Sequence, residues 1–203
     1  MNEKDVIASL IDDIMMVREH FLEKYHFGIL DGYNLKRKGF SDIKDDYEFL
    51  YGIVPDYLCK LDDFMLGESS LTKSKYDIRY RVKHLGTLYP KINQYARREK
   101  RGGKIPLKKG LNDFLGVRII LPNIIKQEDE ILAFLKNEQE GKINRAYLRI
   151  DGSYRAIHCY FAENNFTFPW ELQIWDVQHK NLNYYDHLRH EDQRKKESEG
   201  MLK

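Results

Sequence analysis

The chain has 203 residues, of which 42% are hydrophobic and 33% charged, and its net charge is +2. This length suits one domain with a sizeable core and a helical appendage, and no apolar run in the sequence is long enough to span a bilayer. The acidic N-terminal stretch lacks the pattern of a signal peptide, and Cys59 and Cys159 suggest neither a disulfide framework nor a metal site, so we expect a cytoplasmic protein.

The first third of the chain predicts helices. Apolar residues at three- and four-residue spacing in residues 3–22 indicate an amphipathic helix; they are Val6, Leu10, Ile14, Val17 and Phe21. Residues 23–52 are rich in glycine and tyrosine, which favours turns and short helices. Pro55 is expected to begin a further short helix that ends near Met65.

Residues 75–99 predict another helix, because apolar residues again recur at helical spacing. These residues are Ile78, Val82, Leu85, Tyr89 and Ile92. Lys83, Thr87 and Lys91 follow one another at intervals of four, with Arg81 close by. Such a row could bind a polyphosphate, although this row alone favours ordinary surface lysines.

A strongly basic segment follows this helix. Residues 97–109 hold seven cations and one acid, a net charge of +6; the cations are Arg97, Arg98, Lys100, Arg101, Lys104, Lys108 and Lys109. A nearby polyanion would respond to this local charge rather than to the molecular average. The alternative is a solvated loop, but the position directly before the next strand favours a binding role.

Residues 112–121 predict a buried central strand. The run is apolar and β-branched from Leu115 onward, and Pro122 ends it. Asp113 lies at its start and Arg118 within it. A buried charge is costly unless it is paired, hydrogen-bonded or bound to metal, so we expect partners for both side chains.

Two further strands are expected after a crossover helix at residues 124–139. The first follows a turn at residues 151–153, and a period of two puts Tyr154, Ala156, His158 and Tyr160 on one face. These side chains could stack on and hydrogen-bond a base, or form a half-buried strand with a satisfied histidine. In the second strand, residues 168–175, the side chains expected on the face away from the core are Glu171, Gln173 and Trp175.

The C-terminal part is expected to close the domain with a helix at residues 177–194. Its predicted buried side consists of Leu182, Tyr185 and Leu188. We expect an N-terminal helical region (1–70) packed on a core (71–195) and a flexible tail (196–203).

Asp113 and Glu171 form the chemical centre of this pattern. Carboxylates from neighbouring strands can hold Mg²⁺, which prefers oxygen ligands. Cations on a nearby helix would bind phosphates, and this set of groups is typical of phosphoryl transfer. The residues alone therefore indicate an enzyme that acts on a magnesium–nucleotide complex.

Five motifs in order resemble the synthetase domain of the RelA/SpoT family, and the resemblance covers residues 75–190. The motifs are Arg81-Val82-Lys83 with Thr87 and Lys91, Asp113 to Ile119, Ser153 to His158, Glu171 to Ile174, and Tyr185 to Arg189. The resemblance implies an α+β fold: a mixed β-sheet of about five strands flanked by helices, related to nucleotidyltransferases. It also implies transfer of the β,γ-diphosphate of ATP to a ribose 3′-hydroxyl.

The resemblance also assigns roles to single residues. Asp113 and Glu171 would bind Mg²⁺, and Glu171 would activate the attacking hydroxyl. ATP would contact a set of five residues: Arg81, Lys83, Thr87, Lys91 and Arg118. Arg81 and Arg118 would enclose the adenine, and the other three would hold the phosphates. The acceptor would contact Tyr154, His158 and Gln173.

The sequence departs from the family pattern near the second acid. The family usually has Arg-Thr after this motif, whereas here Trp175-Asp176 follows. Losing a cation and gaining an acid disfavours a free guanosine nucleotide as the acceptor, and the basic run 97–109 suits a longer anion. Both traits resemble the toxic small alarmone synthetases, which modify the tRNA 3′ CCA end, block translation and are paired with an antitoxin protein.

We therefore expect tRNA as the acceptor, with synthesis of (p)ppGpp from GDP or GTP as the alternative. A catalytically silent RNA- or nucleotide-binding module is a weaker alternative, because both acids are present. The sequence is compatible with a homo-oligomer and gives no sign of a membrane partner.

Overall fold

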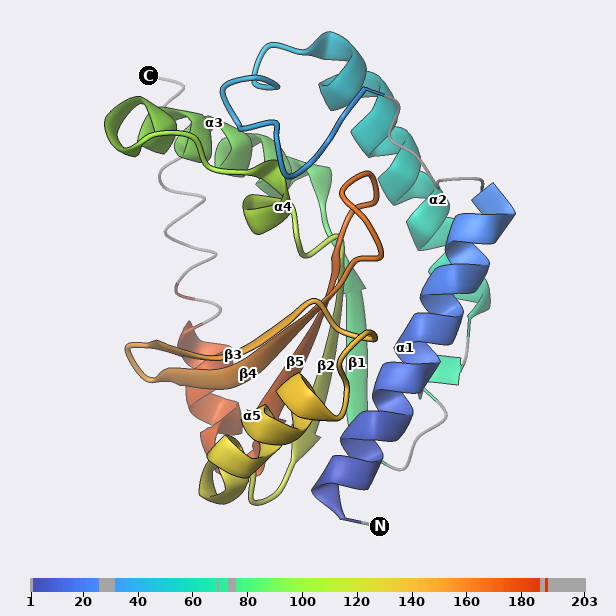
Figure 1. Cartoon of the computed structure of the whole chain (residues 1–203), viewed down its shortest axis with the longest axis vertical. Helices are drawn as coiled ribbons and strands as arrows, with labels where there is room; N and C mark the ends of the chain where they lie inside the picture. Colours follow the sequence, from blue (N-terminus) through green and yellow to red (C-terminus); the bar gives the residue numbers. More distant parts are fainter. Residues whose placement is uncertain (1, 26–31, 69, 73–75, 187–188, 190–203) are drawn as a thin grey trace.

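The computed structural model describes residues 2–25, 32–68, 70–72, 76–186 and 189. They form an α+β fold around one mixed five-stranded sheet with the order β1-β2-β5-β4-β3 (Figure 1). The strands are β1 (Asp77–Val82), β2 (Leu115–Leu121), β3 (Arg145–Asp151), β4 (Tyr154–Phe161) and β5 (Trp170–Asp176). β2 and β5 pair in parallel and the other neighbours pair antiparallel. The predicted fold class is confirmed.

The helices are α1 (Glu3–Tyr25), α2 (Val54–Gly67), α3 (Leu85–Gly102), α4 (Leu107–Gly110) and α5 (Glu128–Asn137). Shorter helical segments are η1 (Glu48–Ile53), η2 (Ser70–Thr72), η3 (Ile125–Gln127) and η4 (Val177–His179). In the part of the chain that the structure describes, every helix is too short or too polar to serve as a membrane span.

One face of the sheet lies in the main hydrophobic core. Val117, Ile119, Leu172 and Ile174 pack there with apolar residues from α1, α2, α3 and α5. The five apolar residues of the predicted N-terminal helix are all buried in this core, which confirms that helix. The helix expected to begin at Pro55 is also confirmed as α2.

The predicted helix at 75–99 is wrong in its first part. Asp77–Val82 is strand β1, which pairs with β2, and the helix begins only at Leu85. Ile78, Tyr80 and Val82 alternate along this segment and all pack against the core, as a strand with one buried face requires. The four-residue spacing from Ile78 to Val82 fits a period of two equally well, so spacing alone could not separate the two.

The crossover prediction is confirmed. The chain passes from β2 through η3 and α5 to β3, and the pairing directions make β3 parallel to β2. β3 then turns into β4 at Gly152 and Ser153. Gly152 has a φ of +64°, a left-handed conformation that glycine adopts without a steric penalty.

The predicted buried side of the closing helix is wrong. Residues 180–186 are helical, but Leu182 and Tyr185 are 46% and 67% exposed, and Leu188 lies outside the described residues. The helix instead buries Asn183 and Asp186. The Asn183 amide accepts a hydrogen bond from the Arg155 backbone N–H (2.9 Å) and donates to the Arg155 carbonyl (3.0 Å). Hydrogen bonds to β4 therefore decide which side faces inward.

A buried cation joins α1 to the β4–β5 loop, which leads into the strand that carries Glu171. Arg18 is fully buried, and its guanidinium donates to Glu163 Oε1 (2.6 Å), Thr167 Oγ1 (3.1 Å) and the Phe168 carbonyl (3.4 Å). Of these groups, Glu163 is the one that neutralises the charge. The contact therefore fixes the start of β5 against the N-terminal helix.

Replacing Glu163 with alanine should lower the free energy of unfolding by about 1–3 kcal/mol, because a buried guanidinium loses its charged partner. Urea denaturation measures this, and Glu23→Ala on the exposed side of α1 is the matched control. Equal midpoints for the two variants would show that the neutral partners of Arg18 suffice.

Candidate functional site

The face of the sheet opposite the main core carries polar residues in cross-strand rows. One row runs from Arg79 through Arg118, Gln173 and His158 to Tyr147, and paired residues in a sheet point to the same side. The next row runs from Arg81 through Gly116, Glu171 and Tyr160 to Arg145. This face therefore combines acids, cations and aromatic rings from all five strands.

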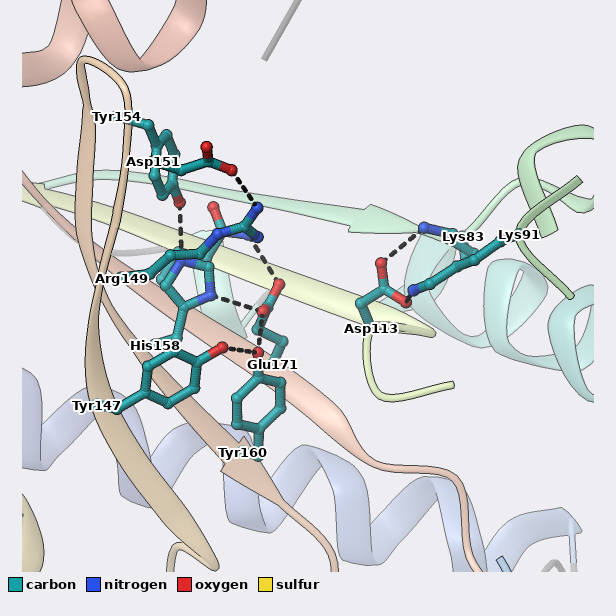
Figure 2. A network of polar contacts seen from close by, with 11 residues as sticks. Lys83, Lys91, Asp113, Tyr147, Arg149, Asp151, Tyr154, His158, Tyr160 and Glu171 are labelled. Atoms are coloured by element: carbon teal, nitrogen blue, oxygen red, sulfur yellow. Dashed lines mark hydrogen bonds and ion pairs between the residues drawn. The ribbon is translucent and has the colours of Figure 1, made fainter. Parts of the chain in front are cut away.

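Glu171 lies in the middle of this face and is only 7% exposed. Its Oε1 bonds His158 Nδ1 (2.7 Å) and accepts from the Tyr160 hydroxyl (2.8 Å), and its Oε2 accepts from Gln173 Nε2 (2.7 Å). Figure 2 shows His158 and Tyr160 pointing toward the carboxylate. An ionised Glu171 only accepts, so His158 donates to it through Nδ1, and the other ring nitrogen, Nε2, lies 2.8 Å from the Tyr154 hydroxyl.

These donors keep Glu171 ionised. Burial raises the pKa of Glu171, but the hydrogen bond from His158 and the charge of that ring outweigh burial, so the pKa lies below its ordinary value. Oε2 accepts one bond from Gln173 and keeps a second lone pair. A buried, ionised carboxylate with a spare lone pair can accept a proton from a hydroxyl group.

Asp113 forms a second polar cluster just before β2. Lys83, at the end of β1, lies 2.6 Å from Asp113 Oδ2, and Lys91, on α3, lies 3.2 Å from Oδ1 (Figure 2). Burial raises the pKa of Asp113, but the charges of Lys91 and Lys83 lower it well below its ordinary range. The sequence predicted that Asp113 would have a partner, and in this structure it has two, Lys83 and Lys91.

The two carboxylates stand at the same end of adjacent parallel strands. Gly116 is the register partner of Glu171, and Asp113 precedes Gly116 by three residues. Asp113 is close enough for its negative charge to oppose the lowering of the Glu171 pKa. The strand pairing thus places two anionic groups near one another at the start of β2 and β5.

The two acids fit a magnesium ion chemically, provided that phosphates complete its coordination. Mg²⁺ in nucleotide enzymes usually takes one or two carboxylates plus phosphate oxygens and waters. Both side chains are ionised, and both are oxygen ligands. The described residues contain no group of three or more His, Cys, Asp or Glu suited to a metal, so this pair is what that part of the chain would supply.

Arg118, the cation within β2, lies against aromatic rings. Its guanidinium carbon is 3.7 Å from the centre of the Trp175 ring and 5.3 Å from that of Tyr184. A cation over an aromatic face is stabilised by the ring quadrupole. Trp175 therefore supports one face of the guanidinium. Arg81 lies on the same side of the sheet, two residues after Arg79, which is the register partner of Arg118.

Thr87 and Tyr154 also have partners within the protein. The Thr87 hydroxyl donates to the His84 carbonyl (2.8 Å) in the exposed first turn of α3. Tyr154 is 7% exposed, and its ring packs edge-on against Trp175 with the centroids 6.0 Å apart. Its stacking on an acceptor base stays a prediction.

Asp176 lies away from Glu171. It is five residues further along β5, about 16 Å at the usual rise per residue. Its carboxylate is buried and accepts from the backbone N–H groups of Ile125 (3.0 Å) and Gln178 (2.7 Å). Asp176 therefore caps the segment after β5, and its charge is not directed at Glu171.

Five of the seven cations predicted to bind a polyanion are exposed on the surface of α3 and α4. They are Arg97, Arg98, Lys100, Arg101 and Lys109. The Arg98 guanidinium carbon also lies 5.3 Å from the centre of the Tyr95 ring. Lys104 pairs with Asp42 (2.6 Å). Lys108 is half-buried and donates to the Asn164 carbonyl (3.0 Å) and to Asn165 Oδ1 (3.2 Å), so it holds the β4–β5 loop.

The sequence interpretation missed four residues on the open face. Tyr160 bonds Glu171 directly, and the Tyr147 ring stacks with those of His158 and Tyr160 at centroid distances of 5.8 and 6.1 Å. The exposed Arg145 and Arg149 stand at the same edge. Alternation predicted the face of Tyr160, but the hydroxyl contact depends on the register between β4 and β5, which a single sequence does not give.

The fold and the site define an α+β protein whose polar sheet face holds one ionised carboxylate, with a second just before β2, beside lysines and arginines. No protein-family model and no curated protein matches the chain.

The solved structures that are similar to it include three that illustrate the match. The small alarmone synthetase 1 of Bacillus subtilis bound to its product pppGpp is 18% identical, and the match covers 74% of this chain and 81% of that chain with a TM-score of 0.39. A GTP pyrophosphokinase family protein of Streptococcus pneumoniae is 16% identical, with coverages of 74% and 77% and a TM-score of 0.39. The small alarmone synthetase 2 of Bacillus subtilis is 17% identical, with coverages of 77% and 83% and a TM-score of 0.36. Identities and TM-scores this low do not indicate what the protein does, so its function is inferred from the site residues.

Replacing Tyr160 with phenylalanine should raise the pKa of Glu171, because the ionised carboxylate loses a donor. The folded-state pKa is lowered, so ionised Glu171 stabilises the fold above its ordinary pKa and this contribution is lost as the pH falls. Phenylalanine should shrink that contribution.

A carboxyl-carbon NMR titration measures the pKa directly. Tyr80→Phe removes a hydroxyl that donates to the Met65 carbonyl and serves as control. An unchanged Glu171 titration in Tyr160→Phe would show that His158 and Gln173 alone set this pKa.

Proposed function

We propose that this protein is an ATP-dependent pyrophosphokinase that transfers the β,γ-diphosphate of ATP to a ribose 3′-hydroxyl. The observation that carries the proposal is the pair of ionised carboxylates at the start of β2 and β5, one paired with two lysines and the other held by three donors. The first arrangement suits phosphate and metal binding, and the second suits proton abstraction.

The donor would bind between β1, β2 and α3. Lys83 and Lys91 would contact the phosphates, with the Thr87 hydroxyl at the helix start. Arg118, supported by Trp175, would stack on the adenine, with Arg81 on the other side. Asp113 and Glu171 would hold Mg²⁺, which supplies charge neutralisation at the phosphates when it is bound.

The reaction needs one base. Glu171 Oε2 would accept the proton of the ribose 3′-hydroxyl while the hydroxyl oxygen forms a bond to the β-phosphorus. The bond between this phosphorus and the oxygen bridging to the α-phosphorus breaks, and AMP leaves. Lys83 and Lys91 would balance the negative charge that spreads over the transferred group, and Glu171 would return its proton to water.

The tRNA 3′ CCA end is the favoured acceptor. Its support is the exposed set Arg97, Arg98, Lys100, Arg101 and Lys109 on α3 and α4, since cations on a surface bind a phosphate backbone whatever its sequence. Tyr154, His158 and Gln173 would hold the terminal adenosine. With this acceptor the protein would be a toxin that inhibits translation, and its partner would be an antitoxin protein.

GDP or GTP is the second candidate acceptor, and the reaction would then make (p)ppGpp. The position of Asp176 favours this candidate, because its carboxylate is occupied as a cap and does not repel an anion beside Glu171. Arg145 and Arg149 are exposed on the acceptor side of the sheet and could bind its phosphates.

Incubation with ATP labelled in the γ-phosphate should transfer label to one acceptor, tRNA in preference to GDP. Glu171→Gln should lower the transfer rate by about 10²–10⁴-fold, because the base is lost, while ATP binding persists. Glu138→Gln at the exposed end of α5 is the control. ATP binding without transfer to any acceptor would favour the silent binding module.

If tRNA is the acceptor, neutralising Arg101 and Lys109 with glutamine should weaken tRNA binding. The slope of log affinity against log salt should fall by about one for each phosphate that the protein no longer neutralises, and the affinity for ATP should stay the same. Lys126→Gln on the surface after β2 is the control.

Lys108 is left intact in this test because it holds the β4–β5 loop. Equal losses of ATP and tRNA affinity would place Arg101 and Lys109 at the donor site instead.

A further inference from the structure

Lys83, Lys91 and Asp113 form a closed ion cluster in which every charge already has a partner. Lys83 Nζ lies 2.6 Å from Asp113 Oδ2, and Lys91 Nζ lies 3.2 Å from Asp113 Oδ1. The side chains of Lys83, Lys91 and Asp113 are 3%, 17% and 20% exposed, so water does little to replace a partner that is removed.

A divalent cation on its own meets an unfavourable site. Asp113 is the nearest carboxylate of the cluster, but two ammonium groups flank it, and the cluster carries a net charge of +1. The arriving cation would have to displace at least one lysine from a carboxylate oxygen. Lys83 is buried at the end of β1, so it would lose its partner without reaching bulk water.

A triphosphate without metal meets the opposite problem. To bind the phosphates, the lysines would have to turn away from Asp113, which would leave a largely buried carboxylate beside a highly charged anion. Like charges a few ångströms apart repel each other more strongly in a protein site than in bulk water. Metal-free ATP can therefore bind the lysines only by leaving Asp113 unpaired.

We infer that Asp113, Lys83 and Lys91 make the donor site selective for the metal–nucleotide complex over either component alone. When both arrive together, the pairs exchange: the carboxylate turns to the metal and the lysines turn to the phosphates, so no buried charge is left without a partner. This inference rests on the proposed use of ATP as the donor, but it concerns binding and not transfer.

Isothermal titration of the wild-type chain tests the inference without any substitution. ATP with excess Mg²⁺ should bind at least about tenfold more tightly than ATP in EDTA, a difference of about 1.4 kcal/mol. Mn²⁺ alone, followed by electron paramagnetic resonance, should show no binding at this cluster. Equal affinity for ATP with and without metal would overturn the inference, whatever the transfer assay shows.

Asp113→Asn gives the sharper test, because the inference predicts a gain. With the carboxylate gone, both lysines are available to phosphates, so ATP in EDTA should bind about tenfold more tightly than it binds the wild type. Added Mg²⁺ should then strengthen binding little. Weaker binding of metal-free ATP to a folded Asp113→Asn protein would overturn the inference.

Asp77→Asn is a matched control on the same strand. Asp77 also bridges two cations, with Arg79 Nε at 3.0 Å and Lys180 Nζ at 2.8 Å. It lies six residues from Lys83, about 20 Å along β1, so this substitution should leave ATP binding unchanged with and without Mg²⁺. A similar gain in Asp77→Asn would show a general charge effect and would overturn the inference.

Lys83→Met tests the other half of the cluster. Without the buried ammonium group, Asp113 should bind Mn²⁺ alone, which the wild-type cluster should not do, with the resonance signal as the readout. A thermal melt establishes that each variant is folded. Loss of transfer with the metal coupling intact would refute the proposed function only.

Discussion

The parallel pairing of β2 with β5 is the constraint on which the site depends. β5 follows β2 by some fifty residues, and α5, β3 and β4 lie between them in the chain. Parallel strands begin at the same edge of the sheet, so Asp113 and Glu171 come from distant segments to one place. β4 then lies on the other side of β5, which brings His158 and Tyr160 to the same carboxylate.

Burial makes each acid depend on its partners. Burial alone would raise the pKa of both carboxyl groups, and both acids stay ionised because donors or cations surround them. The partners differ in kind: Glu171 has three hydrogen-bond donors from β4 and β5, whereas Asp113 has two lysines on different elements. Glu171 is therefore held in place, and Asp113 can change partners when phosphates offer the lysines another anion.

Much of this site follows from sequence patterns, and the failures have identifiable causes. Alternation placed Glu171, Gln173 and Trp175 on the face away from the core, and the apolar run of β2 identified the central strand. The strand at Asp77–Val82 was missed because two of its apolar residues are also four apart. Leu182 and Tyr185 were misplaced because Asn183 and Asp186 anchor the helix by hydrogen bonds, which hydrophobic spacing does not register.

Residues with the same charge have different roles because their partners differ. Lys108 and Lys109 are adjacent in the basic run, yet Lys108 binds carbonyl and amide oxygens of the β4–β5 loop and Lys109 is exposed. On the sequence alone, the negative charge of Asp176 disfavoured a free nucleotide as the acceptor. In the structure its carboxylate accepts hydrogen bonds from two backbone N–H groups. In the proposed reaction, acceptor choice would depend on the exposed cations around Glu171: those of α3 and α4 on one side, and on the other Arg145 and Arg149, of which Arg149 pairs with Asp151 (3.1 Å).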